Sequence, residues 1–137
     1  METDPSEENI QRMSDYQEEF DALDGYNMDN KTAEILEGLG FKTSDLDRPM
    51  NEFSGGWRMR VVLAKMLLEE PDIMLMDEPT NHLDLPSIEW LENYLSNYPG
   101  SVVIVSHDRE FLNKMINKTA ELSNNKLYLW RAIMTFF

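Results

Sequence analysis

Two adjacent carboxylates follow an unbroken apolar run in the second half of the chain. The run is Ile73–Met76, and Asp77 and Glu78 come directly after it. Such a run is typical of a parallel strand buried on both faces, and ligands bind at the carboxyl ends of such strands. At that place Asp77 can hold Mg²⁺, directly or through water, and Glu78 can orient and deprotonate an attacking water. A strand end whose carboxylates cap the next turn is the alternative, and the pair alone favours it.

A serine and two glycines stand at the start of a helix-like segment. Ser54, Gly55 and Gly56 precede the run 57–69, and Pro71 ends it. Glycines let a ligand approach the backbone closely, and the free N–H groups at a helix start favour an anion. The segment is therefore a candidate phosphate site. An ordinary helix N-cap is the alternative, and taken alone it is the simpler interpretation.

The two histidines of the chain lie in two polar segments. One segment comes shortly after these carboxylates, and the other follows a second apolar run. Ser106-His107-Asp108 follows the run Val102–Val105, so His107 would lie beside the carboxylates if the two strands are neighbours. His82 lies in Asn81-His82-Leu83-Asp84, shortly after the carboxylates. A capping loop with an incidental histidine is the alternative for residues 106–108.

Hydrophobic spacing predicts the elements that must position these residues. Between the two apolar runs, Pro86 suits the first turn of a helix to about residue 97, with Ile88, Leu91 and Leu95 on its inner face. Strand, helix and strand in this order predict a right-handed βαβ unit with parallel strands.

Further elements are expected on both sides of this unit. An acidic helix should run from Ser6 to about Leu23 and stop at Gly25, because its apolar residues follow each other in steps of 3, 3, 4 and 3. These residues are Ile10, Met13, Tyr16, Phe20 and Leu23. The other predicted elements are a helix from residue 29 or 30 to 39, a loop over 43–51, a helix over 57–69, a helix from 108 to 116, and strands over 119–122 and 126–130 around Asn124-Asn125.

Composition excludes several classes of protein. The chain has 137 residues, with 26 acidic and 12 basic ones and a formal net charge of −14, and residues 1–50 alone carry −10. This balance argues against gripping a phosphate backbone, which needs clustered Lys and Arg. The absence of Cys excludes disulfides, Cys-ligated zinc and Cys nucleophiles. No apolar run approaches the ~20 residues that span a bilayer.

The order and spacing of the motifs resemble an ATP-binding cassette. The segments that carry the resemblance are Phe53–Trp57, Leu75–Asp84 and Ser106–Leu112. Asn-His-Leu-Asp followed downstream by Ser-His-Asp-Arg-x-Phe-Leu is similar to subfamily F, the soluble cassette proteins that act on the ribosome. The likeness is close from about Tyr26 to Leu122. It implies an α/β fold, a partial nucleotide-binding domain with a helical subdomain, part of the parallel core sheet and a C-terminal β-hairpin.

The resemblance also implies roles for the motif residues, with ATP and Mg²⁺ as ligands. Asp77 matches the magnesium carboxylate of the Walker B motif, Glu78 the catalytic base, and His107 the switch histidine that reads the γ-phosphate. The signature motif, which contacts ATP held by the opposite cassette, matches Ser54–Gly56, and Asp84 matches the D-loop aspartate between cassettes. The implied site residues are thus the catalytic Glu78 and His107, the nucleotide-binding Ser54, Gly55, Gly56 and Asp84, and the metal-binding Asp77.

The phosphate-binding loop of the family has no counterpart in these 137 residues, and no Q-loop is recognisable either, because Gln11 and Gln17 lie in the acidic helix. The phosphate-binding Walker A loop, Gly-x-x-x-x-Gly-Lys-Ser/Thr, should precede the signature, and neither residues 38–43 nor Lys31-Thr32 fit it. By resemblance, residues 1–24 are an acidic helix at the end of the arm insertion of a first cassette, and residues 25–137 are the C-terminal portion of the ATPase domain. The loop would supply charged hydrogen bonds worth roughly 1.5–3 kcal/mol each, so we expect the chain alone to bind ATP weakly or not at all and not to hydrolyse it.

Two functions from different classes remain open. The first is a fragment of an ATPase that, in its family, couples ATP binding and hydrolysis to action on the ribosome in translation. Its expected partners are a second cassette or an N-terminal half-cassette and, through a full-length parent, the ribosome, in the cytoplasm. The second is a non-catalytic truncated fragment or docking module for another cassette. The ATP-binding subunit of a transporter is a minor alternative. We expect no direct contact of this chain with nucleic acid or membrane.

Overall fold

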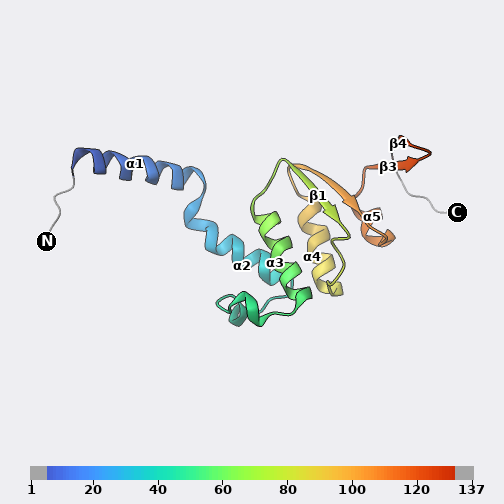
Figure 1. The fold of residues 1–137 in the computed structure, drawn as a ribbon, viewed down its shortest axis with the longest axis horizontal. Helices are drawn as coiled ribbons and strands as arrows, with labels where there is room; N and C mark the ends of the chain where they lie inside the picture. Colours follow the sequence, from blue (N-terminus) through green and yellow to red (C-terminus); the bar gives the residue numbers. More distant parts are fainter. Residues whose placement is uncertain (1–5, 132–137) are drawn as a thin grey trace.

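The computed structural model describes residues 6–131, and this part of the chain folds into five α-helices and four strands (Figure 1). The helices are α1 (Glu7–Ala22), α2 (Met28–Gly38), α3 (Gly55–Leu68), α4 (Leu85–Ser96) and α5 (Arg109–Met115). The strands are β1 (Ile73–Asp77), β2 (Ser101–Val105), β3 (Lys118–Ser123) and β4 (Lys126–Arg131). Short 3₁₀ turns at Thr43–Asp45 and Met50–Glu52 occupy the segment predicted as a loop.

The acidic helix α1 extends away from the rest of the described chain (Figure 1). Ser6 caps its start as predicted, because the Ser6 hydroxyl accepts from the Asn9 N–H at 3.4 Å. The end of the helix differs from the prediction, in which Gly25 stops it. Asp24 (φ 56°), and not Gly25, adopts the left-handed conformation after the helix. Gly25 instead gives room to the Phe20 ring, which would have to move if residue 25 carried a Cβ.

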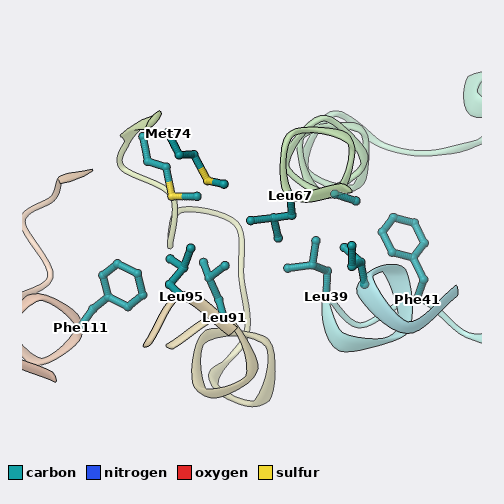
Figure 2. Packing of buried hydrophobic residues seen from close by; sticks show 10 residues of the cluster. Leu39, Phe41, Leu67, Met74, Leu91, Leu95 and Phe111 are labelled. Carbon is teal, nitrogen blue, oxygen red and sulfur yellow. The ribbon is translucent and has the colours of Figure 1, made fainter. Parts of the chain in front are cut away.

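The core lies where α2, α3, α4 and α5 meet one face of the β1–β2 sheet (Figure 2). Its buried apolar residues are Ile35, Leu39, Phe41, Ala64, Leu67, Met74, Met76, Leu91, Leu95 and Phe111. Burying each large side chain contributes about 1.5–3 kcal/mol relative to exposing it. The predicted inner face of α4 is confirmed at Leu91 and Leu95, while Ile88 is half-buried.

β1 and β2 are parallel neighbours, joined through α4 as predicted, with Met74 opposite Val102 and Asp77 opposite Val105. The prediction that β1 is buried on both faces is wrong. Met74 and Met76 are buried, but Ile73 is 65% exposed and Leu75 is 70% exposed. The helices cover only one face, and no residue between 6 and 131 supplies the second layer that a parallel sheet needs.

The last two strands form an antiparallel hairpin in which Ser123 pairs with Lys126. Asn124 and Asn125 have φ values of 50° and 57°, as the two-residue turn predicted for this dipeptide requires. The hairpin lies at the far end of the described chain from α1 (Figure 1). The parallel sheet with its helices and this hairpin together confirm the α/β class expected from the motifs.

Candidate active site

The carboxyl ends of β1 and β2 bring Glu78 and His107 together. The Glu78 N–H donates to the Val105 carbonyl at 2.7 Å, which fixes the first residue after β1 against the last residue of β2. The backbone N–H of His107 donates to both carboxylate oxygens of Glu78, at 3.1 and 3.2 Å. His107 Nε2 lies 3.4 Å from Glu78 Oε1. Two residues that are 29 apart in the chain therefore share one end of the sheet.

The backbone at Glu78 is strained. Its φ of 48° lies in the left-handed region, which non-glycine residues rarely adopt and which costs of order 1–3 kcal/mol. The contacts to Val105 and His107 hold this conformation. The Glu78 side chain is 23% exposed, while that of His107 is 99% exposed. A carboxylate fixed in this way and still open to solvent suits a general base.

Asp77 is the residue best suited to hold a cation. Its carboxylate is exposed at the last position of β1 and makes no hydrogen bond or ion pair within residues 6–131. In the same range no cluster of three or more Asp, Glu or His side chains could enclose a metal. Mg²⁺ is usually bound by one or two carboxylates together with phosphate oxygens and water. The single free carboxylate beside Glu78 therefore fits Mg²⁺ bound jointly with a phosphate.

The two glycines of the signature segment are the first residues of α3, which begins two residues earlier than predicted. Ser54 stands at the N-cap, but its hydroxyl does not cap the helix. A Cβ at Gly55 would meet nothing within 4 Å, and one at Gly56 would only touch the His82 side chain, at 3.6 Å from its Cβ. Neither glycine has a left-handed φ. The described fold therefore does not require glycine at either position. The absence of side chains there would let a ligand or a partner approach the start of α3 closely.

Arg60 links α3 to the loop that carries Asp84 through hydrogen bonds. The motifs did not predict a role for this residue. The guanidinium is buried and donates to the Leu39 carbonyl at 2.8 Å and to the His82 carbonyl at 2.9 Å. It also lies 4.3 Å from the centre of the Trp57 ring. Arg60, Ala64 and Leu67 form the buried row of α3. The sequence did contain a signal for this role, because the spacing of Arg60, Ala64 and Leu67 places a basic residue on the buried side of the helix. A buried cation needs hydrogen-bond partners.

Asp84 caps the start of α4 rather than lying free. Its carboxylate accepts from the Ser87 N–H at 3.3 Å and lies 3.7 Å from Arg60 Nη1. Hydrogen bonding from Ser87 lowers the pKa of Asp84 below its ordinary value. The neighbouring His82 has a left-handed φ of 67° and packs beside Gly56. The loop 79–84, which leads from β1 to α4, therefore also contacts the start of α3.

The implied site residues thus form two groups. Asp77, Glu78 and His107 gather at the carboxyl end of the sheet, while Ser54, Gly55, Gly56 and Asp84 lie around the starts of α3 and α4. A cavity of about 240 Å³ lies between α3 and β1 and has Asp77 and Glu78 in its wall. Met59, Val62 and Leu75 also line it, so its wall is largely apolar.

Comparison with known proteins gives a consistent result. The family model described as "ABC transporter" matches residues 2–81. ABC transporter F family member 3 of Arabidopsis thaliana is 44% identical over 127 residues, which cover 93% of this chain and 18% of that protein. The probable ATP-binding protein YheS of Escherichia coli K12 is 43% identical over 109 residues, covering 80% of this chain and 17% of its own length.

A third relative carries a functional name. The energy-dependent translational throttle protein EttA of Mycobacterium tuberculosis is 41% identical over 128 residues, covering 93% of this chain and 23% of its own length. The chain spans about a fifth of the length of these curated relatives.

Proposed function

The chain belongs to the ATP-binding cassette family, and on that premise we propose that it is the signature-to-switch part of an F-type cassette that hydrolyses ATP. The observation that carries the proposal is the contact between Glu78 and His107 beside the free carboxylate of Asp77. A general base, a histidine that can donate to a phosphate oxygen and a cation ligand at one sheet end are groups that can serve the hydrolysis of a phosphoanhydride.

The proposed reaction is attack of water on the γ-phosphorus of ATP. The Glu78 carboxylate takes the proton of the attacking water, and the bond from the γ-phosphorus to the bridging oxygen breaks, releasing ADP and phosphate. Mg²⁺ at Asp77 would neutralise charge on the phosphates. In this proposal the exposed imidazole of His107, which lies beside Glu78, donates to a γ-phosphate oxygen.

The signature group has a separate role in the proposal. Gly55 and Gly56 leave the start of α3 open, and the first N–H groups of a helix favour an anion. We propose that these N–H groups and Ser54 contact the γ-phosphate of ATP on a second cassette. Arg60 and the Asp84 cap keep this group aligned with the carboxylates through the loop 79–84.

An N-terminal half-cassette is the proposed source of the phosphate-binding loop. Ile73, Leu75, Val103 and Val105 leave one face of the sheet exposed, and the apolar cavity beside α3 continues it. A parallel sheet requires cover on both faces, so this surface is suited to the missing layer. The same surface also supports the second candidate, a docking module that binds another cassette without catalysis.

We also propose the finer assignments that the motifs suggest. Residues 1–24 are the end of an arm insertion, and residues 25–137, of which the last six lie outside the described range, are the C-terminal part of the ATPase domain. The full-length parent acts on the ribosome during translation in the cytoplasm, a proposal supported by the name of the Mycobacterium tuberculosis relative. Within residues 6–131 no helix is long and apolar enough to cross a bilayer.

Complementation tests the proposal. The chain is mixed with a fragment of a relative that carries the Gly-x-x-x-x-Gly-Lys-Ser/Thr loop, and phosphate release is measured. We expect the mixture to hydrolyse ATP, with Asp77→Asn abolishing the Mg²⁺-dependent rate. Asp72→Asn, an exposed carboxylate at the opposite end of β1, is the matched control and should keep that rate. Formation of a stable complex without phosphate release would favour the docking module.

A further inference from the structure

A second cavity lies where β1 and β2 begin, at the opposite end of the sheet from the candidate active site. It has a volume of about 310 Å³ and is lined by Glu70, Asn93, Tyr94, Asn97, Tyr98 and Pro99. These residues come from the end of α4 and from the turns that lead into the two strands. None of the six is basic. The polar groups in its wall therefore decide what this cavity, the helix-end cavity, can bind.

The carboxyl ends of two helices meet at the helix-end cavity. α3 ends at Leu68 and α4 at Ser96, and both end on the side of the fold where β1 begins (Figure 1). Tyr94, in the last turn of α4, donates to the Leu67 carbonyl in the last turn of α3 at 3.0 Å. The carboxyl end of a helix carries a partial negative charge of about half an elementary charge, and the last turn of α4 contains no basic residue. The two helix ends together favour a cation in the cavity.

The polar atoms that stay free in the wall are mainly acceptors. The Tyr98 hydroxyl donates to the Pro71 carbonyl, and the Tyr94 hydroxyl donates to α3, so both hydroxyl oxygens keep only their lone pairs. Asn97 Nδ2 donates to the Asn93 carbonyl at 2.9 Å, which leaves the Asn97 amide oxygen available. These acceptors can bind a group that brings N–H donors of its own.

Glu70 occupies a position where glycine is usual. It is the second residue after α3 and has a left-handed φ of 46°. Glutamate is strained in this conformation, and its charge opposes the negative end of α3. Its carboxylate makes no hydrogen bond or ion pair within residues 6–131. Burial raises the pKa of the neighbouring Tyr98, and the charge of Glu70 raises it further. The described fold gives no reason for a carboxylate here, whereas a bound cation supplies one.

We propose that the helix-end cavity binds a guanidinium group. A guanidinium is permanently charged and carries five N–H donors in one plane, so it can pair with the Glu70 carboxylate and donate to other acceptors of the wall. The cavity lies at the other end of β1 from Asp77 and Glu78. Its occupation therefore requires neither ATP nor a second cassette.

Four probes test the chemistry of the ligand on the full chain. They are the capped peptide Gly-Gly-Arg-Gly-Gly, the same peptide with neutral citrulline in place of Arg, methylguanidinium, and tetramethylammonium, a cation without N–H donors. We expect the Arg peptide and methylguanidinium to shift the backbone NMR signals of residues 93–98. The citrulline peptide and tetramethylammonium should bind at least about tenfold more weakly, because each lacks the charge or the donors.

The two active probes also identify the source of the guanidinium. Binding of the Arg peptide at least about tenfold more tightly than methylguanidinium would indicate a side chain of another protein. Equal affinity of the two would indicate a free small cation. Either result supports the proposed chemistry.

Matched variants locate the site. Glu70→Gln should weaken binding of the Arg peptide at least about tenfold, whereas Glu69→Gln, which removes the same charge beside it but outside the wall, should leave the affinity within about twofold. Glu70→Gly should also lose binding, yet raise the urea midpoint of unfolding, because glycine adopts the positive φ without strain. Asn93→Asp adds a second carboxylate to the wall and should tighten binding.

Several outcomes would overturn the proposal. Equal binding of the citrulline peptide would show that charge is not recognised, and equal binding of tetramethylammonium would show that the acceptors are not used. An equal loss of affinity in Glu70→Gln and Glu69→Gln would assign the attraction to the overall charge and not to the cavity. A lower urea midpoint of Glu70→Gly would show that the fold itself uses the glutamate, and no shift of residues 93–98 with any probe would exclude the site.

Discussion

Replacing Arg60 by Met should destabilise the fold strongly. The substitution keeps an unbranched apolar stem of similar length but leaves the carbonyls of Leu39 and His82 without their donor. Each hydrogen bond from a charged donor contributes about 1.5–3 kcal/mol, and the stacking on Trp57 adds about 0.5–2 kcal/mol. The contact to Asp84 adds little, because that carboxylate is largely exposed and 3.7 Å away. The better packing of Met recovers part of the loss, so we expect a net loss of about 3–5 kcal/mol.

Urea unfolding followed by far-ultraviolet circular dichroism measures this loss. The matched control is Arg58→Met on the same helix, where the exposed guanidinium makes one hydrogen bond of 3.3 Å to the Asn51 carbonyl. The control should cost less than about 1 kcal/mol, and Arg60→Lys should fall between the two variants. If Arg60→Met and Arg58→Met lower the free energy of unfolding equally, the proposed link between α3 and the loop 79–84 is refuted.

Three other outcomes are expected. Gly56→Ala should leave the free energy of unfolding unchanged or raise it by up to about 1 kcal/mol, yet abolish ATP hydrolysis in the complemented system. Gly100→Ala should lower the free energy of unfolding, because its Cβ would lie 2.7 Å from the Asp72 carbonyl oxygen. Urea titrations measure the stability of the two variants, and phosphate release measures the hydrolysis. The buried Glu92 carboxylate accepts from Lys114 at 2.9 Å and raises the pKa of Lys114, so the stability from this pair is present below the unfolded-state pKa of about 10.4 and lost as the pH rises through the higher folded-state value. The difference in Tm between the parent chain and Lys114→Met should therefore be constant near neutral pH and shrink above about pH 10.5. Calorimetry on the chain alone should detect no tight binding of Mg-ATP, and micromolar 1:1 binding would contradict that expectation.

Local signals in the sequence were sufficient for much of the fold. Ser6 and Asp108 cap their helices because a short polar side chain can reach the N–H groups of the first turn. Asn124 and Asn125 form the hairpin turn because both tolerate a positive φ. The parallel pairing of β1 and β2 followed from two apolar runs separated by one amphipathic helix. The caps and the turn depend on residues that are close in the chain, and the strand pairing depends on the order of consecutive elements.

Features that depend on distant contacts could not be predicted in the same way. An apolar run predicts a strand but not how many layers cover it, which is why the exposure of Ile73 and Leu75 was missed. The left-handed backbone of Glu78 and His82 is imposed by partners 29 and 22 residues away, namely His107 and Arg60. The motif order nevertheless placed Glu78 and His107 on adjacent strands, so the proximity that the proposed function needs was expected from the sequence.

The most direct test of the central claim is the rate of phosphate release by the complemented system with Glu78→Gln in this chain. Gln keeps the size and hydrogen-bonding oxygen of the side chain but cannot take a proton from water. We expect the rate at saturating ATP to fall by about 10²–10⁴-fold with little change in ATP affinity, while Asp72→Asn leaves both unchanged. Equal rates for Glu78→Gln and the parent chain would contradict the assignment of Glu78 as the general base.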